Sequence, residues 1–136
     1  MKKVITMLAI VIMAATQAKA DAFLDDFNLY AETMYSIPAI ETVIESVSYR
    51  SESVEITTTD EIIIVGHDPM AVISAACCAL RTIDNAGSMI DQYGRVLNAF
   101  FMNQVHKKET RATTESGVLI YFSEHEGTFT IRLVTH

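Results

Sequence analysis

The sequence predicts an α+β fold, with an N-terminal helix, an antiparallel sheet of about four to five strands, a long central helical segment and a C-terminal β-hairpin. The first observation behind this prediction is that apolar residues recur at helical spacing in residues 21–35 and again in residues 69–104. The second is the alternation of apolar and polar residues over 53–58 and 118–133. The third is size, since 136 residues, half of them apolar, suffice for one domain with one core.

The first twenty residues have the organisation of a secretory signal peptide. Two lysines precede an uncharged apolar run from Val4 to Ala15, and Ala18 and Ala20 provide the small residues that a signal peptidase requires. The run is about 12 residues long, whereas a membrane-spanning helix needs about 20. We therefore expect cleavage after Ala20, a single domain over residues 21–136, and a periplasmic or secreted protein without stable membrane insertion.

Acidic side chains outnumber basic ones in the expected domain. The whole chain has 10 basic and 17 acidic residues, a net charge of −7, and loss of the first twenty residues with their three lysines would change this to −10. A charge of that sign disfavours binding to nucleic acid and to anionic membrane surfaces. We therefore expect no nucleic-acid partner.

The expected domain begins with an amphipathic helix over residues 21–35, which has apolar residues on one side and acids opposite. Pro38 ends this helix, because proline disfavours helical geometry in the residue before it. Residues 38–47 fit either a helix or a strand, and a strand from about Val43 onward is favoured.

Two strands and a buried helix are expected next. Residues 53–58 alternate as a strand with one wet face, whereas residues 62–65 are all apolar, which is typical of a central strand covered on both faces. Asp68 is expected to cap a helix that has Pro69 in its first position. Because this helix is apolar almost all round as far as Ile83, it should be the most buried helix of the fold.

A further helical stretch follows the break at residues 84–87. Ser88 and the acid three residues later resemble a helix start, and the pattern ends near Gln104. Gly94 inside the stretch costs about 1 kcal/mol relative to alanine. Whether residues 69–104 form one helix or two is left open.

One apolar side is predicted for this stretch. Its members are Met89, Ile90, Tyr93, Val96, Leu97, Phe100 and Phe101. Large apolar residues of an amphipathic helix usually face the core, so we predict that Phe100-Phe101-Met102 belongs to the core. The alternative for this cluster is an exposed recognition surface.

The chain is expected to end with a polar loop and a β-hairpin. Residues 106–116 form the loop and residues 118–133 the hairpin, in which Gly127 suits the left-handed position of the turn. The hairpin is expected to expose an edge to which another strand could add.

The two cysteines, Cys77 and Cys78, are adjacent in the predicted buried helix. Neighbouring side chains of a helix point about 100° apart, and their Cα atoms, about 3.8 Å apart, lie closer than disulfide geometry requires. We predict two reduced thiols buried against the sheet. The alternatives are an intermolecular disulfide and a reactive thiol.

Candidate catalytic residues rest on position alone, because the sequence has none of the common phosphate-binding, redox, metalloprotease or nucleophile motifs and no cofactor is expected. His67 and Asp68 lie where a buried strand meets a helix N-terminus, a place that can host an anion or a general base. The favoured interpretation is structural, with Asp68 as helix cap and His67 in a loop.

A candidate metal site lies at the tip of the hairpin. Glu124, His125 and Glu126 carry the carboxylate and imidazole groups that divalent ions accept. Three consecutive residues of a turn point in different directions, so we expect a solvated tip and no metal.

A basic cluster lies in the predicted polar loop. Lys107, Lys108 and Arg111 could hold an acidic partner or a membrane headgroup, although a solvated loop is favoured because three charges attract weakly.

These observations favour a non-enzymatic protein. We predict an exported, periplasmic accessory or binding module that acts through contact with a protein partner or through self-association as a homodimer, using a sheet edge or a helix face. The alternative is a small periplasmic hydrolase or ligand-binding protein with a cleft near His67 and Asp68.

Overall fold

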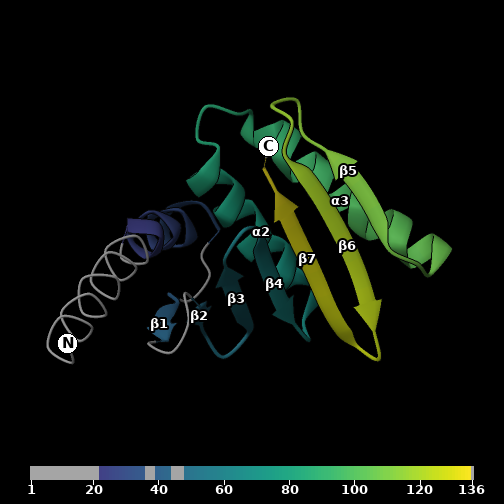
Figure 1. Cartoon of the computed structure of the whole chain (residues 1–136), viewed down its shortest axis with the longest axis horizontal. Helices are drawn as coiled ribbons and strands as arrows, with labels where there is room; N and C mark the ends of the chain where they lie inside the picture. Colours follow the sequence, from purple (N-terminus) through teal and green to yellow (C-terminus); the bar gives the residue numbers. More distant parts are fainter. Residues whose placement is uncertain (1–21, 36–38, 44–47, 136) are drawn as a thin grey trace, which may run out of the picture.

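A computed structural model of the chain describes residues 22–35, 39–43 and 48–135. Within these residues the chain forms one seven-stranded sheet with the strand order β1-β2-β3-β4-β7-β6-β5, and every neighbouring pair is antiparallel (Figure 1). The strands are β1 (Glu41–Val43), β2 (Ser48–Arg50), β3 (Val54–Thr58), β4 (Ile62–Gly66), β5 (Thr110–Thr113), β6 (Leu119–His125) and β7 (Thr128–Val134). The predicted α+β class is confirmed, with more strands than expected.

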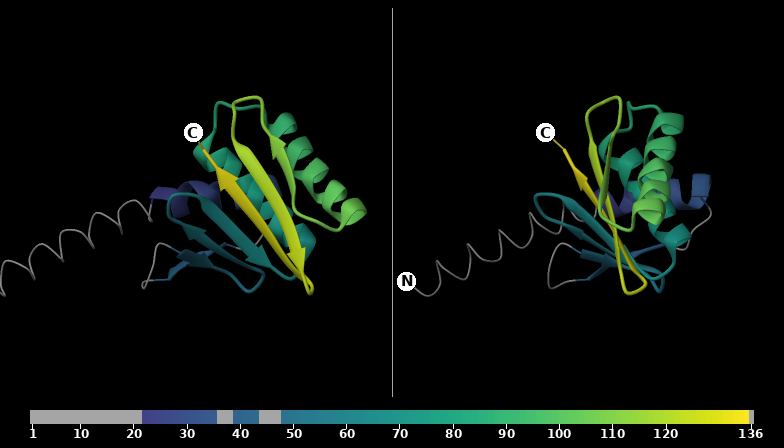
Figure 2. Two further views of the ribbon diagram at one scale, coloured as in Figure 1. Left: turned by 45° about the vertical axis from the view of Figure 1, so that its right-hand side comes forward. Right: turned by 90° about the vertical axis from the view of Figure 1, so that its right-hand side faces the viewer.

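The helices lie on one face of the sheet (Figure 2). They are a helix over residues 22–30 that continues into the π-helical turn η1 (Ala31–Tyr35), then α2 (Pro69–Ile83) and α3 (Met89–His106). Helix α2 packs on β4 and β7, and α3 packs on β5 and β6. The predicted N-terminal helix is thus present, and residues 69–104 belong to two helices rather than one.

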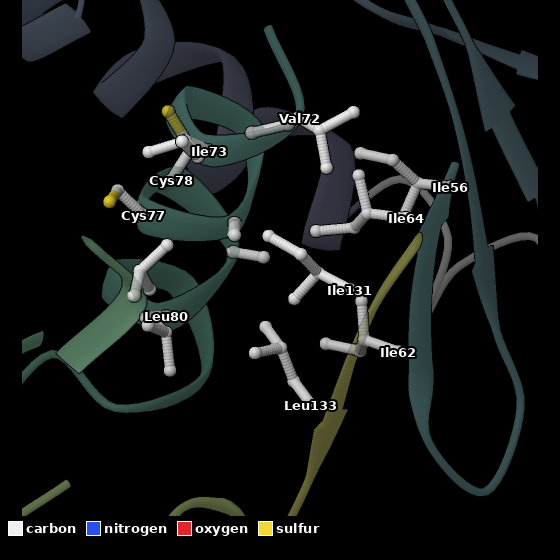
Figure 3. Close-up of a cluster of buried hydrophobic side chains, with 14 of the residues drawn as sticks. Ile56, Ile62, Ile64, Val72, Ile73, Cys77, Cys78, Leu80, Ile131 and Leu133 are labelled. Carbon is white, nitrogen blue, oxygen red and sulfur yellow. The ribbon is translucent and has the colours of Figure 1, made fainter. Parts of the chain in front are cut away.

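The core lies between α2 and the centre of the sheet. Figure 3 shows Leu80 and Val72 of α2 in one cluster with Ile62 and Ile64 of β4 and Ile131 of β7. All of these side chains except Ile62 are fully buried, because alternate residues of β4 and β7 point to the helix-covered face. Helix α2 is therefore the most buried helix among the described residues, as its nearly uninterrupted apolar sequence predicts.

Local sequence signals explain where α2 begins and ends. The Asp68 carboxylate accepts a hydrogen bond from the Met70 backbone N–H at 3.1 Å, and Pro69 is the first helical residue, which confirms the predicted cap. At the other end the Asp84 N–H donates to the Leu80 carbonyl oxygen at 2.8 Å. The Arg81 side chain also donates to the Gly87 carbonyl oxygen at 2.6 Å. This hydrogen bond ties the turn between α2 and α3 to the end of α2.

The predicted polar loop over residues 106–116 is wrong in its middle part, where Thr110–Thr113 forms β5 beside β6. Ala112 is buried opposite Ile120, and the Thr110 hydroxyl donates to the Ala99 carbonyl oxygen of α3 at 2.6 Å. As a result the C-terminal hairpin lies inside the sheet, because β7 pairs with β4 and β6 pairs with β5. The edges are β1 and β5, so the prediction of an exposed hairpin edge is also wrong.

Two sequence predictions concern segments that lie partly or wholly outside the described residues. Within residues 38–47, strand β1 covers Glu41–Val43 and so ends where the favoured strand was expected to begin, while 38 and 44–47 lie outside the described residues. The predicted signal peptide, residues 1–20, also lies outside them. No helix among the described residues combines the length and apolar character needed to cross a membrane.

Cys77 and Cys78 are both buried and unbridged, as predicted. Their sulfur atoms lie on the side of α2 that is turned away from the labelled residues of β4 and β7 (Figure 3). Cys77 instead shares a hydrogen bond with the Tyr35 hydroxyl group of η1. The predicted burial is therefore confirmed, whereas the predicted packing against the sheet is not.

Candidate functional site

Helix α3 has two unlike faces. Its buried side is formed by small or polar residues, namely Gln92, Val96, Ala99 and Asn103. In a helix of 3.6 residues per turn, positions 90, 94, 101 and 105 fall within about 60° of one another and point about 180° away from that buried side. Ile90 is 84% exposed, Phe101 57% and Val105 73%. Three of the larger apolar side chains of α3 are thus aimed away from the core.

We call this surface the α3 outer face. Its members are Ile90, Tyr93, Gly94, Leu97, Phe101 and Val105. No charged side chain lies among them, because Asp91 and Arg95, the two charged residues of α3 besides its terminal histidine, lie on the flank and pair with each other at 3.1 Å. A continuous uncharged apolar stripe on the surface of a protein is typical of a contact surface.

The outer face continues into a groove between η1 and α3, which we call the η1–α3 groove. It has a volume of about 490 Å³ and is lined by Met34, Tyr35, Met89, Ile90 and Tyr93. Since Ile90 and Tyr93 belong to both surfaces, the groove and the outer face form one apolar region. Methionine side chains adapt to differently shaped apolar partners, so this lining suits a protein contact.

Hydrogen bonds at both ends hold α3 in this orientation. At its start the Ser88 side chain accepts from the Asp91 N–H at 3.2 Å, and buried Gln92 donates to the Asp84 carbonyl oxygen at 2.9 Å. At its end buried Asn103 donates to the Lys108 carbonyl oxygen at 2.8 Å. These amides satisfy loop carbonyl groups, which explains why polar residues occupy the inner side of α3.

The Asp91 carboxylate also fixes the loop that follows β5. It accepts from the Glu115 backbone N–H at 2.9 Å, and this hydrogen bond, followed by the contact with Arg95, lowers the pKa of Asp91. A folded-state pKa below the unfolded value stabilises the fold at pH above about 4, and the contribution is lost as pH falls through the folded-state pKa.

We therefore expect Asp91→Asn to lower the thermal midpoint at pH 7 and to have a much smaller effect near pH 2. Thermal unfolding of both proteins across this pH range measures the difference. A difference that stays constant with pH would contradict the role of the Asp91 charge.

The cluster Phe100-Phe101-Met102 is divided between core and surface. Phe100 packs against Phe122 and Phe129 with ring centroids 5.4 and 6.5 Å apart, so the core prediction is correct for it. The prediction is wrong for Phe101 and Met102, which are 57% and 41% exposed. The helix rotation that places Ala99 and Asn103 inside turns these two outward.

His67 and Asp68 lie next to each other but have structural partners. The Asp68 carboxylate is engaged as the helix cap, and Nδ1 of His67 lies 3.4 Å from the Thr128 hydroxyl. His67 borders an open hollow of about 240 Å³ that also includes Arg50 and Glu55. Arg50 and Glu55 pair with each other at 3.2 Å at the surface. Within the part of the chain that the structure describes, no carboxylate is hydrogen-bonded to His67, so this hollow gives a general base little support.

The residues of the predicted metal site do not converge. Glu124 accepts from the Gln104 side chain of α3 at 3.2 Å, whereas Nε2 of His125 lies 4.0 Å from Glu126 with both side chains almost fully exposed. Among the described residues no group of three or more acidic, histidine or cysteine side chains is arranged to hold a metal ion.

Two of the three predicted basic residues lie at the C-terminal end of α3. Lys107 adopts a left-handed conformation with φ of 56° that ends the helix, and Lys107 and Lys108 are both exposed. Arg111 lies apart from them, on β5, with an exposed side chain. The compact basic loop is thus reduced to a lysine pair beside one end of the α3 outer face.

The buried thiols can be tested directly. Burial raises the pKa of Cys77 and of Cys78 to about 12, so neither thiol forms a nucleophilic thiolate near neutral pH. We expect both cysteines to react with a maleimide at least about 100 times more slowly in the folded protein than after denaturation. Rapid labelling of either residue without denaturant would contradict its buried position.

Sequence reasoning considered an exposed surface only as the alternative for Phe100-Phe101-Met102, and it missed the wider α3 outer face. The spacing of Ile90, Leu97, Phe101 and Val105 carries the signal, because it defines a second apolar stripe beside the one that contains Val96. Gly94 within this stripe is a further signal. A Cβ atom added there would meet nothing within 4 Å, so packing inside the described chain does not require glycine.

Comparison of the chain with known protein families, with curated proteins and with solved structures finds no match.

Proposed function

We propose that the protein is an exported accessory module of the bacterial envelope that acts through protein–protein contact, and that the α3 outer face with the η1–α3 groove makes this contact. The observation that carries the proposal is the direction of the apolar residues of α3. Ile90, Phe101 and Val105 point straight away from the core, and nothing in the described chain covers them.

Physical chemistry supports a contact role for this surface. Large apolar side chains exposed in one continuous region cost free energy in water, and covering them by a partner recovers about 25 cal/mol for each Å² buried. Hydrogen bonds at both ends of α3 hold the surface in place before binding, which reduces the ordering cost of association. The residues near His67 offer no comparable arrangement for catalysis.

The experiment that tests the contact is photo-crosslinking in cells that naturally export the protein. A photoreactive amino acid replaces Val105 on the outer face or, as a matched control, Thr113, which is also exposed but lies on β5. We expect discrete protein adducts from position 105 and none from position 113. Equal patterns from the two positions, or no adduct from position 105, would refute the proposal.

Export is the second part of the proposal and is supported by the lysines, the apolar run and the small residues of the first twenty positions. We expect the cellular protein to begin at Asp21 and to be recovered outside the cytoplasm. Mass spectrometry of the purified protein and cell fractionation measure both. A chain that retains Met1 and remains in the cytoplasm would contradict export.

A further inference from the structure

We propose that the partner of the α3 outer face is a second copy of this chain, in a two-fold dimer whose α3 helices pack antiparallel to each other. This inference rests on the proposed protein-contact function and names the partner. Three observations point to it: the area of the face, the position of Gly94 and the charges at the two ends of α3.

The apolar area of the outer face and the groove is close to that which a dimer of moderate affinity buries. The α3 helix of 18 residues is about 27 Å long, and its exposed apolar side chains with those of the groove offer on the order of 600 Å² per copy. A stable interface of standard size buries about 800 Å² per partner, so the apolar face and a polar rim reach this range. A two-fold contact covers the same patch on both copies, which leaves neither patch exposed.

Gly94 gives the outer face a place for close approach. It lies near the centre of the stripe, between Ile90 and Leu97 and one turn from Asn98. A glycine in the middle of a helix costs about 1 kcal/mol, and an added Cβ atom would meet nothing within 4 Å inside the described chain. The absence of a side chain lets the backbone of a facing helix come nearer, as small residues do where helices cross closely. Close packing of a partner helix would therefore explain the glycine at position 94, which contacts within the described chain do not explain.

The ends of α3 carry opposite charges. Lys107 and Lys108 are exposed at its C-terminal end and form no ion pair within the described part of the chain. The acids near them are engaged, since Glu109 lies 3.8 Å from Arg132 and Glu124 accepts from Gln104.

The N-terminal end of α3 is acidic instead. Glu115 is exposed there and forms no ion pair in the described part of the chain, whereas the nearby Asp91 is engaged by Arg95 and by the Glu115 backbone N–H. An antiparallel pair of α3 helices therefore places the lysine pair of each copy beside Glu115 of the other. A parallel pair would place like charges together, which is unfavourable.

The same charges distinguish this partner from a membrane. With a net charge of −10 after loss of the first twenty residues, the domain is repelled by anionic lipid over its whole surface. The same net charge opposes the approach of a second copy, so the dimer depends on the uncharged outer face and on the opposite charges at the two ends of α3. A second copy also presents the opposite charge at each end of the helix by symmetry.

The test measures association of the protein in the form that cells export. Sedimentation equilibrium over about 1 to 100 μM is compared for the parent, for Phe101→Glu, which places a carboxylate in the apolar contact, and for the matched control Thr113→Glu. We expect a two-chain mass for the parent and the control, and at least about a 30-fold weaker dimer for Phe101→Glu. Circular dichroism should be unchanged, since Phe101 and Thr113 are both exposed.

Cysteine crosslinking tests the antiparallel arrangement. A short bis-maleimide should link Asn98→Cys to its own counterpart near the two-fold axis, whereas Val105→Cys lies about 22 Å from its counterpart and should not link. The native thiols are buried and do not interfere. Linking of Val105→Cys to itself would overturn the antiparallel arrangement.

The outcomes separate the two proposals. A single-chain mass at 100 μM, or a dimer unaffected by Phe101→Glu, would overturn the second copy as the partner. If position 105 nevertheless forms adducts with other proteins in cells, the contact function stands and only the identity of the partner is wrong. Binding of the exported protein to vesicles of neutral and anionic lipid, lost in Phe101→Glu, would instead identify a membrane as the partner and overturn both.

Discussion

Replacement of Phe122 by alanine is expected to lower the free energy of unfolding by about 3–5 kcal/mol. Phe122 is fully buried in β6, and its ring lies 5.4 Å from that of Phe100 and 6.1 Å from that of Phe129. The substitution removes the apolar contacts of a whole ring and leaves a cavity between α3 and the sheet. Domains of this size have a total stability of about 5–15 kcal/mol, so a large share would be lost.

Phe101→Ala is the matched control for this prediction, because it also removes a phenyl ring, but from the exposed side of α3. With 57% of Phe101 in water, we expect a loss below about 1 kcal/mol. Urea unfolding at low micromolar concentration, where self-association contributes least, measures both variants. Equal losses for Phe122→Ala and Phe101→Ala would contradict the rotation of α3 that buries Ala99 and exposes Phe101.

Gly66→Ala is expected to destabilise the protein by about 3 kcal/mol, at the upper end of the usual cost of overpacking. Gly66 is the last residue of β4, where an added Cβ atom would lie 2.7 Å from the Ser53 carbonyl oxygen and 2.8 Å from a methyl group of Val72. The Ser53 oxygen is a backbone atom beside β3, so it cannot move without distorting the sheet. The new methyl group would therefore separate α2 from β3 and β4.

Gly94→Ala is the opposite case and serves as the control. Since an added methyl group meets nothing there, the gain in helix propensity should raise the stability of the single chain by about 1 kcal/mol. Urea unfolding measures the free energy of unfolding of both variants, which should fall for Gly66→Ala and rise for Gly94→Ala. Destabilisation by Gly94→Ala in the dilute protein would mean that glycine at this position serves the fold itself.

Local sequence signals are sufficient for much of this fold. The capping residue Asp68, the proline after it and Ser88 mark the starts of α2 and α3 because they act through hydrogen bonds and dihedral angles of their own neighbourhood. The alternation in residues 53–58 and 118–133 likewise predicts β3, β6 and β7, since one side of each strand is buried.

Tertiary contacts decide the features that the sequence does not predict. The strand β5 has only Ala112 as a buried residue and no alternation of large apolar side chains, so it forms because β6 offers a partner and Thr110 is bonded to α3. The place of β6 and β7 between β4 and β5 is likewise a matter of long-range pairing.

The orientation of α3 has the same origin. Its sequence contains two apolar stripes, and hydrophobicity alone favours the larger side chains for the core. The amides of Gln92 and Asn103 instead turn inward to bond the carbonyl groups of Asp84 and Lys108. Phe101 and Val105 are thereby left outside, which is why the candidate contact surface emerges only with the structure.

The most direct test of a covered outer face is the accessibility of Val105→Cys in living cells. A water-soluble maleimide is applied to cells that export the protein and to the same protein purified and diluted below micromolar concentration, with Thr113→Cys as control. If a partner covers the α3 outer face, Val105→Cys reacts at least about tenfold more slowly in cells than in dilute solution, while Thr113→Cys reacts equally in both. Equal reactivity of Val105→Cys in cells and in dilute solution would contradict a protein contact at this face.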